Sequence, residues 1–394
     1  MPTSHSLTRS ISGIICLAVI CVPLLIAPFR REQSLAFVHD MENRTPNAFP
    51  EVQSASNFID ADWWAGVSRA IEDRVPFRKQ MVTANRVVFP ARAGDHISDK
   101  VELGKPGWLF FRKSLAEDLG TLQETNQAIV AIESFIATHT FKADLFIVVA
   151  PNKITIYPEM LTQASQDKYA QSKEQRDILQ AFFAMPDAPH LLDIWTPMLE
   201  LKATSQELLY EPAGSHYNSL GAMVLARSMI DAANPTIWDD SQRVIEWQET
   251  LVPDIAKLIG DWDMTEDQTR YQIHRPGIEA VELTSVNHKT GESSQIQSPT
   301  YLSINEISYY NQRHVINRSV SEPLIEGKTL ILFDSFIGHY LHPTLTQFFE
   351  DVRLIHIGTI DQAFLIEALD TYDRVYFQTA ERHIIRRATE FFED

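Results

Sequence analysis

Apolar runs and amphipathic segments alternate along most of the chain after residue 100. Runs without polar alternation are typical of strands that are buried on both faces. They lie at 107–111, 143–152, 190–195, 329–333, 352–357 and 374–379. Between them, apolar residues at helical spacing predict helices at 122–138 and 221–233. We therefore predict an α/β fold in which a parallel sheet is flanked by helices on both faces.

Two segments depart from this alternation. Residues 235–320 are rich in Gln, Ser, Thr and Asn and lack the regular succession of strand and helix, so we predict an insertion with some strands of its own. Residues 30–99 begin with a polar stretch broken by prolines. Within it, apolar residues at mostly helical spacing over 58–88 predict an amphipathic helix that docks on the main body.

The N-terminus contains a long apolar segment. Residues 11–29 carry no charged side chain, and about 20 apolar residues are what a helix needs to cross a bilayer. A cleaved signal peptide usually has a shorter apolar core and an A-x-A-like site, so we favour a retained transmembrane signal anchor at 10–29 over a cleaved leader. The expected order is a tail (1–9), this anchor, a connector with docking helices (30–99) and a main domain (100–394).

Charge and cysteine content exclude several classes of function. The 394 residues include 34 basic and 52 acidic side chains, for a formal net charge of −18, which disfavours a nucleic-acid partner because such binding depends on Lys and Arg. Both cysteines, Cys16 and Cys21, lie inside the apolar N-terminal segment. The rest of the chain therefore has no disulfide framework and no cysteine-ligated zinc site.

A serine follows one of the predicted strands directly. The run at 329–333 ends in Asp334 and Ser335, and catalytic groups collect at the carboxyl edge of parallel sheets because the loops there stand on a rigid scaffold. The next residues predict a helix, kinked or restarted at Pro343, whose first N–H groups would stabilise an oxyanion. The alternative reading is an ordinary helix N-cap.

A serine nucleophile needs a base, which is usually a histidine. His216 lies in a loop between the predicted strand at 190–195 and the predicted helix at 221–233, and that loop also belongs to the carboxyl edge. A lone histidine in a loop is more often a surface residue, and its distance along the chain from Ser335 does not decide between the two readings.

Several segments together resemble a known family, the alginate O-acetyltransferases of the AlgX and AlgJ type, whose catalytic domain is SGNH-hydrolase-like. The similar segments are GKPGWLFF (104–111), VVAPNKITIYPEML (148–161), GSHYNSLGA (214–222), LILFDSF (330–336) and YDRVYFQTAER (372–382). The resemblance implies an SGNH-hydrolase-like sheet with Ser335 as the nucleophile and His216 as its base.

The chain departs from the family pattern near the histidine. Gly214 stands where the family has the acid that orients the base, and Tyr217 replaces the usual tryptophan. Loss of that acid in a serine protease lowers turnover by about 10⁴-fold. Two readings stay open: a Ser–His dyad that retains some activity without the acid, or a substitute carboxylate from elsewhere, such as Glu211 or Asp334.

Two further charged residues are candidates for supporting roles. Lys153 follows a predicted strand and either lies near the site or caps a turn. Arg382 either binds a carboxylate or acetyl carbonyl or belongs to a solvated helix face. No metal and no cofactor is expected.

The resemblance implies a periplasmic O-acetyltransferase that acts on an exopolysaccharide, as in alginate biosynthesis. The anchor would be a single pass through the inner membrane, with a cytoplasmic tail at 1–9 and the soluble domain in the periplasm. The expected partners are a polysaccharide acceptor and a membrane-bound O-acyltransferase that supplies acetyl groups. Two alternatives remain, a catalytically impaired binding or scaffolding subunit of a polysaccharide acetylation or export complex, and an acetylesterase.

Overall fold

The computed structural model describes residues 35, 47–52, 54, 60–75, 100–115, 119–239, 243–259, 261, 263–287, 290–297 and 311–393. The predicted anchor at 10–29 and much of the connector at 30–99 lie outside these ranges. Within them, no helix has the length and apolar character required to cross a membrane. The chain divides into two units, one of Met1–Ser98 with Asp254–Met264 and one of Asp99–Pro253 with Thr265–Asp394.

The smaller unit contains one helix of the predicted amphipathic stretch. Helix α2 (Ala61–Glu72) begins where the Asp60 carboxylate accepts hydrogen bonds from the N–H groups of Asp62 and Trp63. Such a cap satisfies N–H groups that have no partner within the helix. This unit also includes the short helix α10 (Asp254–Leu258).

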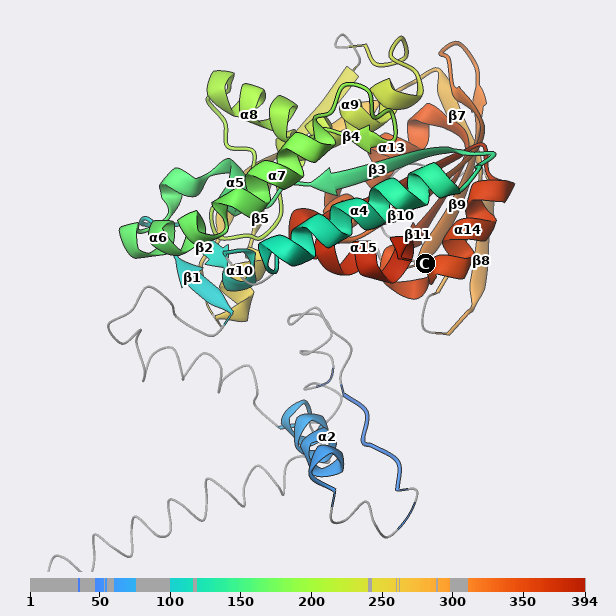
Figure 1. The fold of residues 1–394 in the computed structure, drawn as a ribbon. Coiled ribbons are helices and arrows are strands. Elements are labelled where there is room, and N and C mark those ends of the chain that lie inside the picture. The colour runs from blue at the N-terminus through green and yellow to red at the C-terminus, as the bar shows by residue number, and fades with distance from the viewer. Residues whose placement is uncertain are drawn as a thin grey trace, which may run out of the picture. The chain divides into compact units, whose positions relative to one another are not determined.

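The larger unit is built on a mixed sheet (Figure 1). Its strands, in spatial order, are β4 (Leu191–Leu192), β3 (Asp144–Ala150), β12 (Arg374–Ala380), β10 (Ile325–Phe333), β11 (Phe349–His356), β9 (Gln312–Ser319), β7 (Ile278–Val286) and β8 (Ser293–Gln297). The first five are parallel to one another, and the last three are each antiparallel to their neighbours. The α/β class is confirmed, but the prediction of a purely parallel sheet is wrong.

The antiparallel strands come from the segment predicted to be an insertion. Three of its strands extend the main sheet past β11, while β5 (Arg243–Leu251) and β6 (Glu266–His274) form a separate antiparallel ribbon. A second small ribbon pairs β1 (Val101–Leu103) with β2 (Leu109–Phe111). Side-chain pattern alone did not show that part of the insertion joins the main sheet, because pairing partners are set by contacts distant in sequence.

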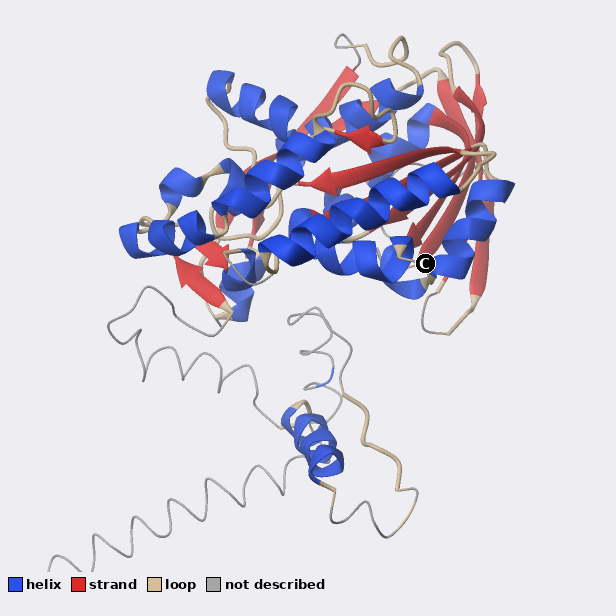
Figure 2. Ribbon diagram, in the orientation of Figure 1, coloured by secondary structure: helices blue, strands red, loops and turns tan. Residues whose placement is uncertain are grey.

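Helices cover both faces of the sheet (Figure 2). Leu330 and Leu332 of β10 belong to one apolar core, whereas Ile331 and Phe333 belong to the other, as expected for alternating side chains. The first core is closed by α4 (Leu122–Thr138), α7 (Lys173–Phe183), α14 (Gln362–Thr371) and α15 (Ile384–Phe392). The second is closed mainly by α9 (Ser219–Ala233), α12 (Ser335–Tyr340) and α13 (His342–Leu345).

The chain after Ser335 forms two short helices in succession. Helix α12 ends at Tyr340, with Leu341 as its C-cap, and α13 has Pro343 in its first turn. A proline is accepted there because the first N–H groups of a helix lack an internal partner. The predicted restart at Pro343 is therefore confirmed.

Candidate active site

Three adjacent parallel strands end at the same edge of the sheet. Strand β12 lies between β3 and β10. Ser335 follows β10, Arg382 follows β12, and Lys153 follows β3. The loop between α8 (Trp195–Thr204) and α9 adds His216 to this edge. Segments far apart in sequence thus meet at the place where parallel sheets usually carry catalytic groups.

The structure brings the serine and the histidine together. The Ser335 hydroxyl and the Nε2 atom of His216 are 2.9 Å apart. The imidazole is largely buried, with 7% of its surface exposed, and its Nδ1 atom is 3.2 Å from the Ser215 hydroxyl. A hydrogen-bonded hydroxyl and imidazole are the arrangement that activates a serine as a nucleophile.

The residues that follow the pair tie the two loops together. The buried Tyr217 hydroxyl donates a hydrogen bond of 2.7 Å to the Phe336 carbonyl oxygen. The Phe336 ring lies 5.0 Å from both the His216 ring and the Tyr217 ring, measured between centroids. Tyr217, which stands in place of a tryptophan, therefore fixes the loop of the histidine against the helix that begins at Ser335.

We expect Tyr217→Phe to reduce both stability and any activity of the Ser335–His216 pair. Loss of the hydroxyl leaves the buried Phe336 carbonyl without this donor, at a cost of about 1–3 kcal/mol in the free energy of unfolding. Tyr376→Phe is the matched control, because its buried hydroxyl donates to the Met229 carbonyl oxygen at 2.7 Å.

Thermal melting and esterase assays with an activated acetate ester measure the two effects. Both variants should melt at a lower temperature than the wild type, and only Tyr217→Phe should lose about tenfold or more in rate at a temperature where both are folded. Equal rates in the two variants would contradict a role for Tyr217 in alignment.

Asp334 has a structural task. One of its oxygens accepts from the Phe336 N–H at 2.9 Å and from the Gln378 amide at 3.0 Å, and the other accepts from the Ala380 N–H at 2.7 Å. The carboxylate thus caps α12 and joins the end of β10 to β12. Both oxygens are engaged by these donors, which makes Asp334 a poor substitute for an acid that orients His216. The Phe336 N–H is likewise committed and does not face an oxyanion.

Lys153 is buried beneath the loop of the histidine. Its ammonium donates to the carbonyl oxygens of Leu109, Glu211, Pro212 and Gly214 at 2.5 to 3.0 Å. With only 4% of the residue exposed, these oxygens replace water around the charge. Lys153 therefore holds the chain just before His216 in one conformation.

Arg382 lies beside the helix of the serine. Its guanidinium is 5.0 Å from the centroid of the Phe336 ring and donates to the Asn152 side-chain oxygen at 3.3 Å. Both neighbours of Arg382 in sequence are shifted in pKa. Burial raises the pKa of Glu381, and burial together with the Arg382 charge lowers the pKa of His383 to about 3. The histidine at 383 is therefore neutral near pH 7, so the positive charge next to it in sequence is that of Arg382.

Glu381 is held in the core by three donors. They are the Asn152 N–H at 2.7 Å, the Thr155 hydroxyl at 2.9 Å and the Trp195 indole at 3.4 Å. These bonds join the end of β12 to the segment after β3. Asn152 was missed by sequence reasoning, although its position directly after a strand end, next to Lys153, is the signal that would have found it.

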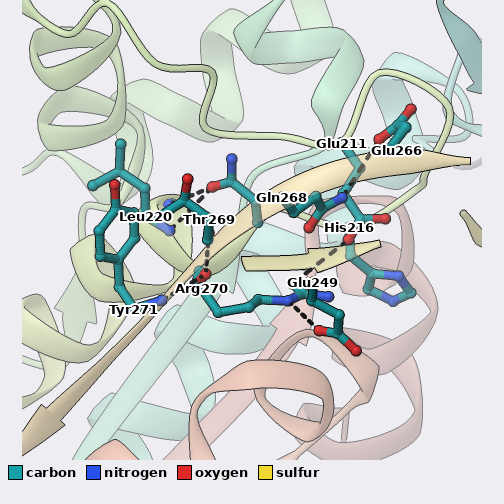
Figure 3. Close-up of polar contacts among 12 residues, drawn as sticks. Glu211, His216, Leu220, Glu249, Glu266, Gln268, Thr269, Arg270 and Tyr271 are labelled. Atoms are coloured by element: carbon teal, nitrogen blue, oxygen red, sulfur yellow. Dashed lines mark hydrogen bonds and ion pairs between the residues drawn. The ribbon is translucent and has the colours of Figure 1, made fainter. Parts of the chain in front are cut away.

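Glu211 lies opposite His216 in the same loop. Its carboxylate is buried, and one oxygen is 3.9 Å from Nη1 of Arg270 on β6. The Nε atom of Arg270 also donates to Glu249 at 2.7 Å. Figure 3 shows Arg270 reaching from its strand toward Glu249 and the loop that carries Glu211 and His216. Sequence reasoning missed Arg270, because the insertion gave no sign that this ribbon reaches the site.

A match to a known protein family agrees with the resemblance found in the sequence. Residues 101–295 match the model of the family described as ALGX, an SGNH hydrolase-like domain of acetyltransferase AlgX. The resemblance to the AlgX acetyltransferases is confirmed. The AlgX-like range contains His216 and Lys153, whereas Ser335 lies after it. No curated protein sequence matches the chain significantly.

Solved structures resemble the chain at low sequence identity. PatB1 of Bacillus cereus, determined with a sulfonyl adduct, is 15% identical, with a TM-score of 0.51, and the match covers 75% of this chain and 100% of PatB1. The O-acetyltransferase domain of Pseudomonas putida AlgJ is 16% identical, with a TM-score of 0.39, and the match covers 72% of this chain and 92% of the AlgJ domain. Pseudomonas aeruginosa AlgX is 14% identical, with a TM-score of 0.40, and the match covers 74% of this chain and 66% of AlgX. The likeness to PatB1 shows a shared fold.

Proposed function

We propose that this protein is a polysaccharide O-acetyltransferase in which Ser335 is the nucleophile and His216 the general base. The observation that carries the proposal is the 2.9 Å contact between the Ser335 hydroxyl and His216 Nε2 at the carboxyl edge of the sheet. The AlgX family match supports acetyl transfer as the class of reaction.

The first half of the reaction forms an acetyl-enzyme. As the Ser335 oxygen bonds to the acetyl carbonyl carbon, its proton passes to His216 Nε2 and the carbonyl electron pair moves to oxygen. Collapse of the tetrahedral intermediate breaks the bond to the leaving group, which takes the proton back from His216. The acetyl group is then held as an ester of Ser335.

The second half transfers the acetyl group to the polysaccharide. A sugar hydroxyl gives its proton to His216 Nε2 while its oxygen attacks the acetyl-serine carbonyl, and the bond to Ser335 then breaks as the serine regains a proton from His216. Arg382, on the flank of Phe336, is the cation we assign to the carbonyl oxygen of the acetyl group. Charge that develops on this oxygen is stabilised most by a donor fixed in advance.

The cellular setting of the proposal comes from the sequence. We assign 1–9 to a cytoplasmic tail, 10–29 to a single-pass inner-membrane anchor and 30–99 to a connector with docking helices. The SGNH-hydrolase-like domain, 100–394 with its insertion at 235–320, would then act in the periplasm. A membrane-bound O-acyltransferase would supply acetyl groups to Ser335.

Mass spectrometry of the chain after exposure to an activated acetate ester tests the chemistry. We expect an acetyl adduct on the peptide that contains Ser335, and none on this residue in Ser335→Ala or His216→Ala. Adduct at other serines but not at 335 would overturn the proposal.

The same samples separate the transferase from its alternatives. A transferase passes acetyl from Ser335 to an added polysaccharide acceptor, whereas an acetylesterase releases acetate to water even when acceptor is abundant. For a scaffolding subunit, Ser335→Ala leaves polymer acetylation in cells unchanged while deletion of the gene abolishes it.

A further inference from the structure

The loop that carries His216 folds back on itself as a small antiparallel pair. Tyr210 and Tyr217 form an antiparallel bridge, and their rings are 6.1 Å apart between centroids. On either side, the Asn218 N–H donates to the Leu209 carbonyl at 2.9 Å and the Glu211 N–H donates to the His216 carbonyl at 3.4 Å. Glu211 is therefore the cross-strand partner of His216.

Cross-strand partners present their side chains on the same face, with Cβ atoms about 4.5–5.5 Å apart. Backbone pairing thus puts the Glu211 side chain on the same face of the loop as the His216 imidazole. Glu211 is 4% exposed and His216 is 7% exposed, so the two groups share a site with little water. A charge acts more strongly there than it does in bulk solvent.

Arg270 offsets the energetic cost of a negative charge on the buried Glu211 side chain. A buried carboxylate is costly unless a partner compensates its charge. The guanidinium, 3.9 Å from one Glu211 oxygen, supplies a positive charge there, while His216 Nε2 faces Ser335. The Lys153 ammonium adds a second positive charge beneath the loop through the carbonyl oxygens of Glu211 and Gly214.

Gly214 provides the room that the Glu211 side chain occupies. A Cβ atom at 214 would be 2.7 Å from the Glu211 Cβ and 3.1 Å from its Cδ, and closer still to Oε2. Real Cβ contacts are not that short, so a side chain at 214 and the Glu211 carboxylate exclude each other. The space that a side chain at 214 would take, two residues before His216, is occupied by the side chain of Glu211.

We propose that Glu211 is the positioning carboxylate of His216, a role that rests on the proposed acyl transfer through Ser335. When His216 Nε2 accepts the serine proton, the imidazole becomes an imidazolium, and the fixed negative charge of Glu211 stabilises it. The carboxylate also fixes the tautomer with hydrogen on Nδ1, together with the Ser215 hydroxyl at 3.2 Å. In this tautomer Nε2 is free to accept the proton.

The test replaces Glu211 in the full-length chain and follows acetyl transfer. We expect Glu211→Gln to lower kcat by about 10² to 10⁴-fold while KM changes by less than about threefold, because the carboxylate acts in the transition state. Glu249→Gln is the matched control, since it removes the other carboxylate bound to Arg270, and it should keep kcat within about twofold of the wild type.

Moving the acidic residue from position 211 to position 214 tests whether the two side chains compete for one space. The double variant Glu211→Gly with Gly214→Asp places a carboxylate in the same space from the other position. The kcat of the double variant should be at least about tenfold higher than the kcat of Glu211→Gly alone. Failure to recover, with both variants folded by circular dichroism, would contradict the inference.

A spectroscopic arm is independent of acetyl transfer. In chain labelled with ¹⁵N-histidine, the His216 Nδ1–H signal, assigned by its loss in His216→Ala, should be present in the wild type and shifted or lost in Glu211→Gln. If that signal is unchanged in Glu211→Gln but altered in Ser215→Ala, Ser215 holds the ring and the role of Glu211 is refuted. If Ser335 never carries acetyl yet Glu211→Gln alters the signal, only the proposed function fails.

Discussion

His216→Ala is expected to lower the rate of acetyl-enzyme formation by at least about 10⁴-fold, equivalent to about 5 kcal/mol of activation free energy. Without the imidazole at 2.9 Å, nothing in the pair removes the proton from the Ser335 hydroxyl as it attacks. Stopped-flow measurement of the released leaving group from an activated acetate ester gives this rate directly.

The control is a histidine to alanine change on a strand outside this loop. His314 on β9 pairs with Asp351 and is 37% exposed at its side chain. His314→Ala should react at the wild-type rate. If His216→Ala were as fast as His314→Ala, with acetyl still found on Ser335, the histidine would not be the base, and Ser335 would have to be activated by another group.

Lys153→Met is expected to be the most damaging single change to the site scaffold. It removes one ammonium from four carbonyl oxygens, all within 3.0 Å, and leaves them facing an apolar side chain. We expect a loss of about 3 kcal/mol in the free energy of unfolding, since buried acceptors that lose a charged donor are costly. Urea denaturation followed by circular dichroism measures this loss.

The matched variant is Lys173→Met. Lys173 forms an ion pair with Asp177 one helical turn away, the two side chains are 65% and 56% exposed, and such pairs contribute at most about 1 kcal/mol. Lys153→Met should also stop acetylation of Ser335 under conditions where the variant remains folded, because the base loop loses its support. Equal stability of the two variants would show that the four carbonyl contacts do not hold the loop.

Local signals in the sequence predicted many elements closely. Helix α4 has the bounds expected from its apolar spacing, 122–138, because Thr121 and Glu124 form a capping box that fixes its start. Strands β3, β10 and β12 lie on predicted apolar runs because both of their faces are buried. Strand β4 is only two residues long, since Trp195 of the predicted strand already begins α8.

The positions beyond the reach of local signals are those decided by contacts across the chain. The pattern after 329–333 placed Ser335 at a strand end, but Asp334 next to it binds Gln378 and Ala380 of β12, which no spacing indicates. Gly214 looked like a missing acid in the sequence. Only the folded loop shows that the Glu211 side chain fills the space a residue at 214 would need.

The order of strands in the sheet has a consequence for biosynthesis. Strand β12 lies between β3 and β10, so β3 and β4 share no edge with the other strands until β12 is in place. A ribosome synthesises β12 after every other strand of this sheet in the part of the chain that the structure describes. During translation the nascent chain therefore carries two separate sets of strands with exposed edges, and they need protection from aggregation until residues 374–380 emerge.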